Sequence, residues 1–108
     1  NVHLQQDKEG GLNLERIARI EALTSLPLVI HGGSGVPVEQ RRHRSAKTSI
    51  CKFNIGTELR MAFGSALRAS VEADPSRFDR VQILSDTLDP VQRAAQEVLR
   101  AFGAPPQR

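Results

Sequence analysis

Apolar positions recur along the chain with two different periods, and these periods divide the chain into helices and strands. A helical period predicts a first helix over residues 14–24, with Asn13 as its N-cap. The aliphatic run at residues 26–31 predicts a short strand, and residues 1–3 have the composition of a strand end. The chain therefore begins with a strand end, a helix and a strand.

Two further helices and a second complete strand are predicted downstream. Pro37 opens a helix over residues 37–47, because proline fits the first turn of a helix. Residues 50–55 predict the strand. The next helix runs to residue 73 with Thr57 as its cap, and we expect its apolar face to pack against the sheet. That face consists of Leu59, Ala62, Phe63, Ala66, Leu67 and Val71.

The C-terminal part of the chain ends in another helix. Residues 76–84 fit no single period. Asp89 is then expected as a cap, Pro90 as the first helical position, and Gly103 as the stop. Strands that alternate with helices pair in parallel, so the order of elements predicts an α/β fold.

Length and composition limit the classes of protein that remain. A chain of 108 residues suffices for one small domain or for part of a larger one, and the strand end at residues 1–3 favours the tail of a longer protein. No apolar run approaches the roughly 20 residues of a membrane span, so we expect no membrane partner. The single cysteine, Cys51, cannot form an internal disulfide, which favours the reducing cytoplasm.

The net charge of +3 and the isoelectric point near 9.8 permit nucleic-acid binding. The sequence has no Trp or Tyr on which bases would stack. Nucleic-acid binding also leaves the glycine-rich loops described below unexplained, so we expect no nucleic-acid partner. The basic cluster that such a function would use consists of Arg41, Arg42, Arg44 and Lys47.

Small polar loops follow the two complete predicted strands. Gly32, Gly33 and Ser34 come after the first strand, and residues 54–57, Asn-Ile-Gly-Thr, end the second. Parallel βα units bind ligands at the carboxyl ends of their strands, where glycines let backbone N–H groups approach a phosphate. Taken alone, Gly-Gly-Ser-Gly is more often a simple turn. Two such loops after adjacent strands predict one phosphate held between them.

His3 and His31 stand at the ends of neighbouring predicted strands. A histidine in such a position is more often a hydrogen-bonded structural residue than a ligand. Two imidazoles at adjacent strand ends can also share a metal ion. Both interpretations remain open on spacing alone.

The segments PLVIHGGSGVP (residues 27–37) and ICKFNIGTELRMAF (residues 50–63) resemble the class II, metal-dependent ketose-bisphosphate aldolases. The likeness covers most of residues 1–73. The family fold is a TIM barrel of eight strands and usually ~250 residues. The resemblance implies that residues 1–108 are the C-terminal part of a single barrel domain, from the end of strand six through strand eight and the final helices.

The resemblance also implies roles for individual residues. His3 and His31 match two zinc-binding histidines, and zinc would polarise the substrate ketone. Asn54 matches a residue near the reacting end of dihydroxyacetone phosphate. The third zinc histidine and the aspartate that acts as general acid/base are expected upstream of Asn1, so this chain alone should be inactive. The residues that match the phosphate-binding segments are Gly32, Gly33, Ser34, Asn54, Ile55, Gly56 and Thr57.

Two positions depart from the family pattern. The family usually has glycine after the histidine matched by His3, where it contacts the phosphate and a monovalent cation, but this sequence has Leu4. Ser49 replaces the usual glycine before the second strand. These changes fit a divergent or a damaged member of the family.

The resemblance implies reversible, zinc-dependent aldol cleavage of a ketose bisphosphate into dihydroxyacetone phosphate and an aldehyde. It further implies a homo-oligomeric glycolytic enzyme of the cytoplasm. The alternative is a non-catalytic phosphate-binding remnant, or an accessory subunit of the same family, in which the loops persist without the base and the third metal ligand.

Overall fold

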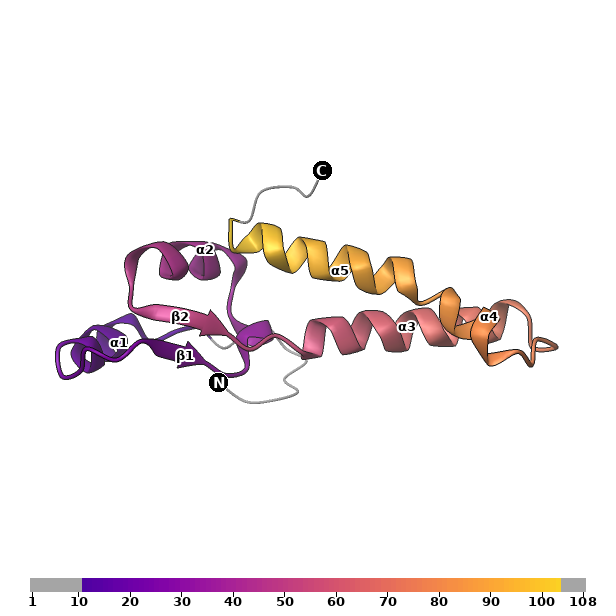
Figure 1. Cartoon of the computed structure of the whole chain (residues 1–108), viewed down its shortest axis with the longest axis horizontal. Coiled ribbons are helices and arrows are strands. Elements are labelled where there is room, and N and C mark those ends of the chain that lie inside the picture. The colour runs from indigo at the N-terminus through magenta and orange to yellow at the C-terminus, as the bar shows by residue number, and fades with distance from the viewer. Residues whose placement is uncertain (1–10, 104–108) are drawn as a thin grey trace.

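The computed structural model describes residues 11–103, except for the side chains of residues 43–47. The predicted strand end at residues 1–3, with His3, and the neighbouring Leu4 lie outside the described residues. The molecule is elongated, with extents of 59 × 32 × 21 Å (Figure 1). Its radius of gyration of 17.3 Å exceeds the about 13 Å expected for a compact domain of this length.

A parallel two-stranded sheet lies at one end of the described chain (Figure 1). Strand β1 (Leu28–Ile30) pairs with β2 (Ile50–Phe53), and helix α2 (Val38–Lys47) connects them, so the predicted βαβ unit is confirmed. Leu28 lies opposite Ile50 and Ile30 opposite Phe53. Both strands are shorter than the predicted residues 26–31 and 50–55: β1 begins two residues later than predicted, and both strands end early where the chain enters the loops that follow.

The N-terminal caps show which local predictions were correct. Asn13 caps α1 (Leu14–Glu21) by accepting a hydrogen bond from the Arg16 backbone N–H at 2.9 Å, as predicted. Helix α1 nevertheless ends three residues before position 24. The cap of α3 (Thr57–Ala73) is Gly56 and not Thr57, which is the first helical residue. The predicted stop after residue 73 is confirmed.

Helix α3 packs antiparallel against α5 (Leu88–Ala101), which corrects the expectation that it packs on the sheet (Figure 1). A 17-residue helix is about 25 Å long, whereas strands of three and four residues span about 10–13 Å. Most of α3 therefore extends beyond the sheet. On its predicted apolar face, Phe63 is 39% exposed and Val71 is 48% exposed.

The ambiguous residues 76–84 include most of a short helix, α4 (Arg80–Ser85), which Asp79 caps through the Val81 N–H. Helix α5 starts at Leu88, one residue before the predicted cap. Pro90 is then the third helical residue, where its missing N–H costs no hydrogen bond because the first four N–H groups lack helical partners. None of the helices in residues 11–103 is long and apolar enough to cross a membrane.

A polar cluster holds α4 to the end of α3. The Ser70 hydroxyl donates to Asp86 Oδ2 at 2.8 Å, and Arg77 Nη1 donates to the same oxygen at 2.6 Å. These two hydrogen bonds lower the pKa of the Asp86 carboxyl from its usual value, the bond from Ser70 having the larger effect. The cluster thus fixes the turn at the far end of the α3–α5 arm.

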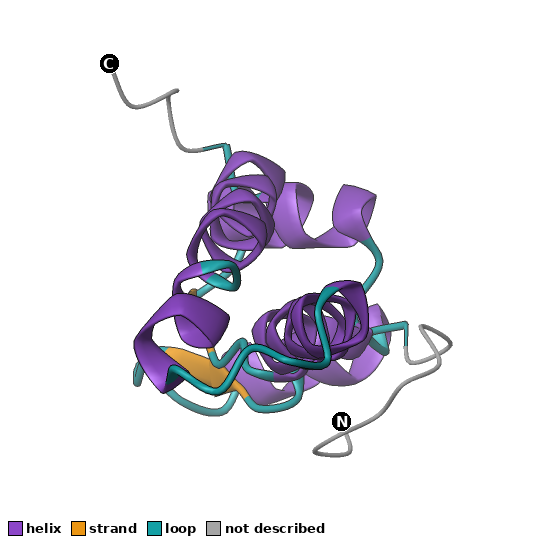
Figure 2. Cartoon of the chain, turned by 90° about the vertical axis from the view of Figure 1, so that its right-hand side faces the viewer, coloured by secondary structure: helices purple, strands orange, loops and turns teal. Residues whose placement is uncertain are grey.

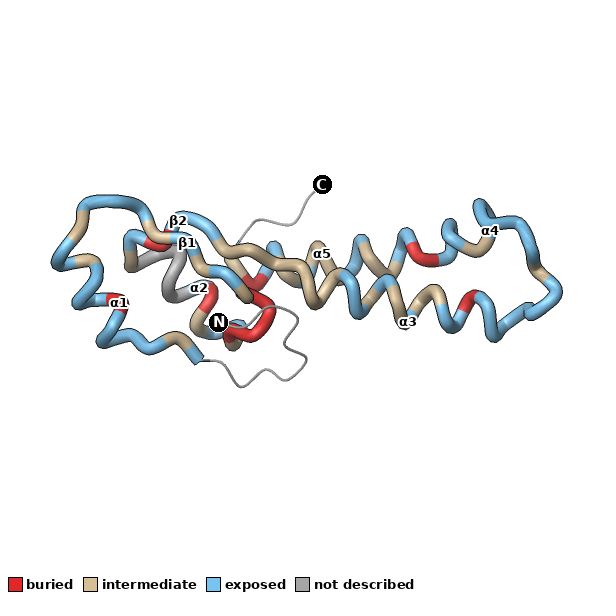
Figure 3. Tube along the Cα trace, turned by 90° about the horizontal axis from the view of Figure 1, so that it is seen from below, coloured by how far each residue is buried: buried red, intermediate tan, exposed pale blue. Residues whose placement is uncertain are grey.

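The buried part of the molecule lies where the first loop meets α2 and the sheet. Among the residues whose burial is described, the longest continuous buried stretch comprises residues 33–36, part of which forms the short 3₁₀ helix η1 (Gly33–Gly35) (Figure 3). The end-on view shows that helices make up most of the cross-section and that the strands form a small patch at one side (Figure 2). The C-terminal end of α5 returns to this region, since the rings of Phe102 and Phe53 lie 4.8 Å apart.

Candidate phosphate-binding site

Backbone hydrogen bonds join the two loops at the carboxyl ends of β1 and β2. The N–H of Asn54 donates to the carbonyl of Ile30 at 2.9 Å, and the N–H of Gly33 donates to the carbonyl of Asn54 at 3.0 Å. The first bond continues the ladder by one residue, and the second ties η1 directly to the loop after β2. The structure therefore brings the two predicted loops side by side.

Two glycines allow this close approach. Gly32 has a φ of 66°, in the left-handed region that residues with a Cβ rarely adopt. Gly33 has no room for a side chain, because a Cβ there would lie 2.8 Å from Ile55 Cδ1 and 3.1 Å from the Asn54 carbonyl oxygen. The glycines thus serve the contact between the loops as well as any approach of a ligand.

Ser34 connects η1 to the start of α3. Its side chain is buried, and its Oγ accepts a hydrogen bond from the Glu58 backbone N–H at 3.4 Å. Glu58 is the second residue of α3, so this N–H is one of the donors that a helix leaves without a helical partner at its N-terminus. The remaining N-terminal donors of α3 are the kind of group that binds anions.

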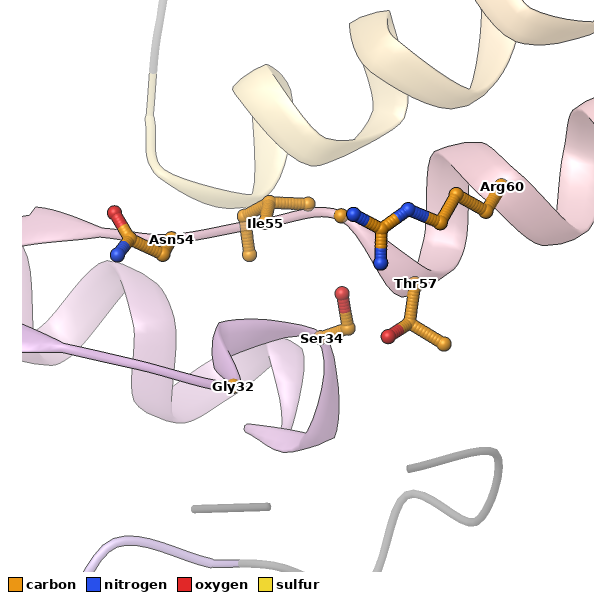
Figure 4. Close-up of a pocket in the computed structure, with 7 residues that line it drawn as sticks. Gly32, Ser34, Asn54, Ile55, Thr57 and Arg60 are labelled. Carbon is orange, nitrogen blue, oxygen red and sulfur yellow. The ribbon is translucent and has the colours of Figure 1, made fainter. Parts of the chain in front are cut away.

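A small pocket of about 160 Å³ lies between the two loops (Figure 4). Complete ligand sites usually measure ~300–1,000 Å³, so this pocket has the size of a subsite for one small group. Its lining includes every predicted phosphate-binding residue except Gly33, which packs against Ile55 and the Asn54 carbonyl. It also contains Arg60, which was not among the predicted site residues. The lining residues are Gly32, Ser34, Asn54, Ile55, Gly56, Thr57 and Arg60.

His31 lies beside Asn54 across the strand ends. The Asn54 amide and the His31 Nδ1 atom are 3.1 Å apart, within hydrogen-bonding distance, and the imidazole is exposed. The tautomer of the ring decides which partner donates. A hydrogen bond to one ring nitrogen is the usual way in which proteins orient a metal-binding histidine. His31 therefore fits the role of one metal ligand.

The other predicted metal ligand, His3, lies outside the described residues. Within residues 11–103, no group of three or more His, Cys, Asp and Glu side chains is placed to hold a metal ion. A catalytic zinc site usually takes three protein ligands. The described part of the chain thus supplies His31 as one candidate ligand.

Arg41 is a buried structural residue. It is therefore excluded as a member of the basic cluster that nucleic-acid binding would use. Its side chain donates from Nε to the Val36 carbonyl at 2.8 Å and from Nη2 to the Ser34 carbonyl at 3.1 Å. It also forms an ion pair with Glu58. With 1% of its surface exposed, Arg41 cannot reach a nucleic-acid backbone. No spacing rule in the sequence connects residues 41 and 58, so sequence reasoning missed this pair.

Arg60 is exposed on α3 and lies beside the pocket. The sequence signal that places it at the pocket is its distance from Gly56, since side chains four residues apart lie on the same helical face and point back toward the N-terminus. A residue at this position therefore covers the first turn of α3.

The fold and the joined loops define an α/β protein with a pocket at the carboxyl ends of two parallel strands, where such proteins commonly bind ligands. Residues 1–106 match the family model of the class-II fructose-bisphosphate aldolases. The chain belongs to this family, as its two loop motifs indicated.

Three relatives illustrate the similarity. A fructose-bisphosphate aldolase of Geobacillus stearothermophilus is 33% identical over 96% of this chain and 36% of its own length. A 6-phospho-5-dehydro-2-deoxy-D-gluconate aldolase of Shouchella clausii is 35% identical over 96% of this chain and 35% of its own length. A fructose-bisphosphate aldolase of Mycoplasma pneumoniae is 47% identical over 68% of this chain. The chain thus spans about a third of the length of the first two relatives.

Proposed function

We propose that the protein catalyses metal-dependent aldol cleavage of a ketose bisphosphate into dihydroxyacetone phosphate and an aldehyde, and that this chain holds the dihydroxyacetone phosphate half of the site. The observation that carries the proposal is the pocket between the loops after β1 and β2. It combines a phosphate-sized space with backbone and hydroxyl donors, and it belongs to a chain of the class-II aldolase family.

The described residues have distinct roles in this proposal. The N-terminal amides of α3 and the hydroxyls of Ser34 and Thr57 would bind the phosphate oxygens. Asn54 would orient both the substrate and the His31 ring, which lies 3.1 Å from its amide. The backbone of Gly32, Ile55 and Gly56 would shape the walls of the pocket, while Gly33 holds the two loops together.

The metal site would draw His3 and His31 from this chain and further ligands from elsewhere in the protein. Bound zinc supplies Lewis acidity at the substrate carbonyl. His31 fits a zinc ion because its imidazole lies at a strand end within hydrogen-bonding distance of the Asn54 amide, and an imidazole oriented in this way is a usual zinc ligand. Leu4 leaves the monovalent cation of the family without its usual glycine neighbour.

We further propose that β1 and β2 are strands seven and eight of a TIM barrel and that residues 1–108 form its C-terminal part. Parallel strands are normally covered on both faces, yet Val29 at the centre of β1 is 44% exposed here. Neighbouring barrel strands and helices would cover this surface. We also propose a cytoplasmic, homo-oligomeric enzyme, without a nucleic-acid or membrane partner, and expect residues 1–108 alone to be inactive.

The alternative function is a non-catalytic phosphate-binding subunit of the same family. It is favoured by Leu4, which stands where the family usually has a glycine that contacts the phosphate. Such a protein would bind dihydroxyacetone phosphate without turning over a ketose bisphosphate.

The test is an assay of fructose 1,6-bisphosphate cleavage by the native gene product that carries this chain. Cleavage that is lost with a chelator and restored by zinc supports the proposal. Binding of dihydroxyacetone phosphate without cleavage of any ketose bisphosphate supports the alternative. Failure to bind dihydroxyacetone phosphate contradicts both.

A further inference from the structure

Lys52 lies on the face of the sheet that is turned away from α5. Phe53, the next residue of β2, directs its ring toward the end of α5, where it lies 4.8 Å from the ring of Phe102. Successive residues of a strand face opposite sides, so the side chain of Lys52 faces away from that helix. Lys52 is opposite Val29 in the strand register, and both residues are exposed. These two residues therefore share a face that is open to solvent in the described part of the chain.

The same face continues to the ends of the strands. Residues two apart in a strand lie on one side, so Lys52 shares this face with Asn54. The ladder extends that far, because the Asn54 N–H donates to the Ile30 carbonyl at 2.9 Å. The Asn54 amide in turn lies 3.1 Å from the Nδ1 atom of His31. Lys52 is ~6.6 Å behind Asn54 along the strand, and a long side chain that leans along the strand brings its ammonium to the level of Asn54 and His31.

The ammonium of Lys52 has no acidic partner in the described part of the chain. The strands β1 and β2 contain no Asp or Glu. The ion pairs of the described side chains join Arg41 to Glu58 and Arg77 to Asp86. In the proposed barrel the helices lie outside, so the face turned away from α5 becomes the interior. A lysine in an interior is almost always paired, and we therefore expect an anionic group beside this ammonium.

The phosphate pocket and the face that carries Lys52 lie at two ends of the candidate site. The lining of the pocket includes Ser34 and Thr57 but neither Lys52 nor His31. Asn54 belongs to both ends, because it lines the pocket and contacts His31. In Figure 4 its side chain lies on the opposite side of the view from Thr57. A ligand whose phosphate occupies the pocket thus extends past Asn54 toward His31 and Lys52.

We propose that Lys52 contacts the oxygen atoms of the ligand at the end away from the phosphate and favours negative charge there. The proposal rests on the proposed function, because it takes the same ligand, and it goes further by assigning a cation to the reacting end. In cleavage, a hydroxyl on the aldehyde side gives its proton to a base from elsewhere in the protein. The carbon–carbon bond breaks, and its electron pair moves to the ketone, whose oxygen becomes negative. The ammonium of Lys52 stabilises that charge and keeps its own protons.

The test compares two ligands that share a phosphate, by calorimetry on the native gene product that carries this chain. Phosphoglycolate has a carboxylate at its other end, whereas glycerol 3-phosphate has hydroxyls there. Lys52→Met should weaken binding of phosphoglycolate by about 10- to 100-fold, the usual effect of losing a charge-assisted hydrogen bond. Binding of glycerol 3-phosphate should stay within about twofold of the wild type. The matched control is Arg19→Met, which removes an exposed positive charge from α1 and should change neither affinity.

Unchanged binding of phosphoglycolate by Lys52→Met overturns the proposal. An equal loss for both ligands also overturns it, because Lys52 would then support the structure of the site and not one end of the ligand. Steady-state kinetics with fructose 1,6-bisphosphate give a second readout. Lys52→Met should lower kcat by about tenfold or more and change KM by less than about threefold, since the charge that it stabilises develops in the transition state.

Two measurements on the wild type need no variant. Trinitrobenzenesulfonate should modify Lys52, and phosphoglycolate should slow that modification more than glycerol 3-phosphate does at equal occupancy. Equal protection by the two ligands contradicts the proposal. Borohydride added with dihydroxyacetone phosphate should leave Lys52 unmodified, because the side chain acts through its charge. A reduced adduct on Lys52 would show a Schiff base and overturn the proposal.

Failure of the proposed function gives a different result. If the wild type shows no metal-dependent cleavage but Lys52→Met loses phosphoglycolate selectively, the inference about Lys52 stands and the aldolase activity falls. If the wild type cleaves a ketose bisphosphate with a normal response to zinc but Lys52→Met keeps its kcat and its affinity for phosphoglycolate, the activity stands and the inference falls.

Discussion

The guanidinium of Arg41 forms a two-point ion pair with the carboxylate of Glu58 and so joins α2 to the first turn of α3. Nη1 lies 3.2 Å from Glu58 Oε2, and Nη2 contacts Oε1. The same guanidinium group bonds the carbonyls of Val36 and Ser34. Both segments that form the pocket are therefore held by one buried side chain, which also lies 6.0 Å from the centre of the Phe102 ring.

Arg41→Met should destabilise the protein by about 3–5 kcal/mol, since it removes one partner of a largely buried ion pair and leaves two carbonyls without a donor. Chemical denaturation measures this loss. The control is Arg42→Met at the next position, which is exposed and should change the free energy of unfolding by less than about 1 kcal/mol. Equal effects of the two substitutions would show that Arg41 has no special structural role.

Gly33→Ala should destabilise the protein by about 1–3 kcal/mol, because the new Cβ would lie within 2.8 Å of Ile55 Cδ1 and force the loops apart. Binding of dihydroxyacetone phosphate should weaken with it. Gly64→Ala is the matched control, since its Cβ would meet the flexible end of Arg68 at 3.6 Å within a helix. That substitution should stabilise the protein by about 0.5–1 kcal/mol. A stable Gly33→Ala protein with unchanged ligand affinity would contradict the assigned role of this glycine.

Asn54→Leu should lower kcat about 10- to 100-fold and weaken zinc binding, because the His31 ring loses the amide that orients it. The fold should persist, as the backbone bonds of residue 54 to Ile30 and Gly33 remain. Steady-state kinetics and zinc content after dialysis measure the effect. Asn13→Ala provides the contrast: it removes the α1 cap, should cost about 1 kcal/mol of stability, and should leave kcat unchanged. An unchanged kcat in Asn54→Leu would remove the functional link to His31.

The stability of the α3–α4 junction should depend on pH through Asp86. Hydrogen bonds from Ser70 and then Arg77 hold the pKa of this carboxyl below its usual 3.8 in the folded protein. Because the folded pKa is lower than the unfolded one, the ionised carboxylate stabilises the fold above pH 3.8, and this contribution is lost as the pH falls through the folded pKa. Asp86→Asn should lower the melting temperature at neutral pH and flatten its decline in acid.

Ser70→Ala tests the same cluster by removing the hydroxyl donor in place of the Asp86 carboxylate. Without the hydroxyl, the pKa of Asp86 should rise toward its usual value, since the larger of the two stabilising hydrogen bonds is gone. NMR titration of the carboxyl measures this change directly. An unaltered titration would mean that Arg77 alone sets the pKa of Asp86.

Local features of the fold could be predicted from the sequence because the interactions behind them span only a few residues. The Asn13 cap, the stop after residue 73 and the reversal at Gly103, with a φ of 82°, each depend on a side chain or a glycine within one helical turn. The predicted caps of α3 and α5 were wrong by one and two residues, because the actual N-cap residues, Gly56 and Thr87, make no side-chain cap hydrogen bond that a capping pattern could reveal.

The meeting of the two loops could also be predicted, although they are more than 20 residues apart. Parallel strands joined by a helix must end at the same edge of the sheet, so the polar residues that follow them must be neighbours. The hydrogen bond between Gly33 and Asn54 confirms that expectation. The alternation of strands and helices determines the parallel topology, and the parallel topology places the two loops next to each other.

The tertiary structure alone decided which charged residues are buried, paired or turned toward the pocket. Arg41, Arg42 and Arg60 are equally polar in the sequence, yet the first is buried, the second is exposed, and the third lines the pocket. Burial of a charge depends on a partner that only the folded chain supplies, as Glu58 does for Arg41. The sequence by itself determined most of the elements of residues 11–103, their order and the loop pair, whereas packing between distant segments decided which charges hold and line the pocket.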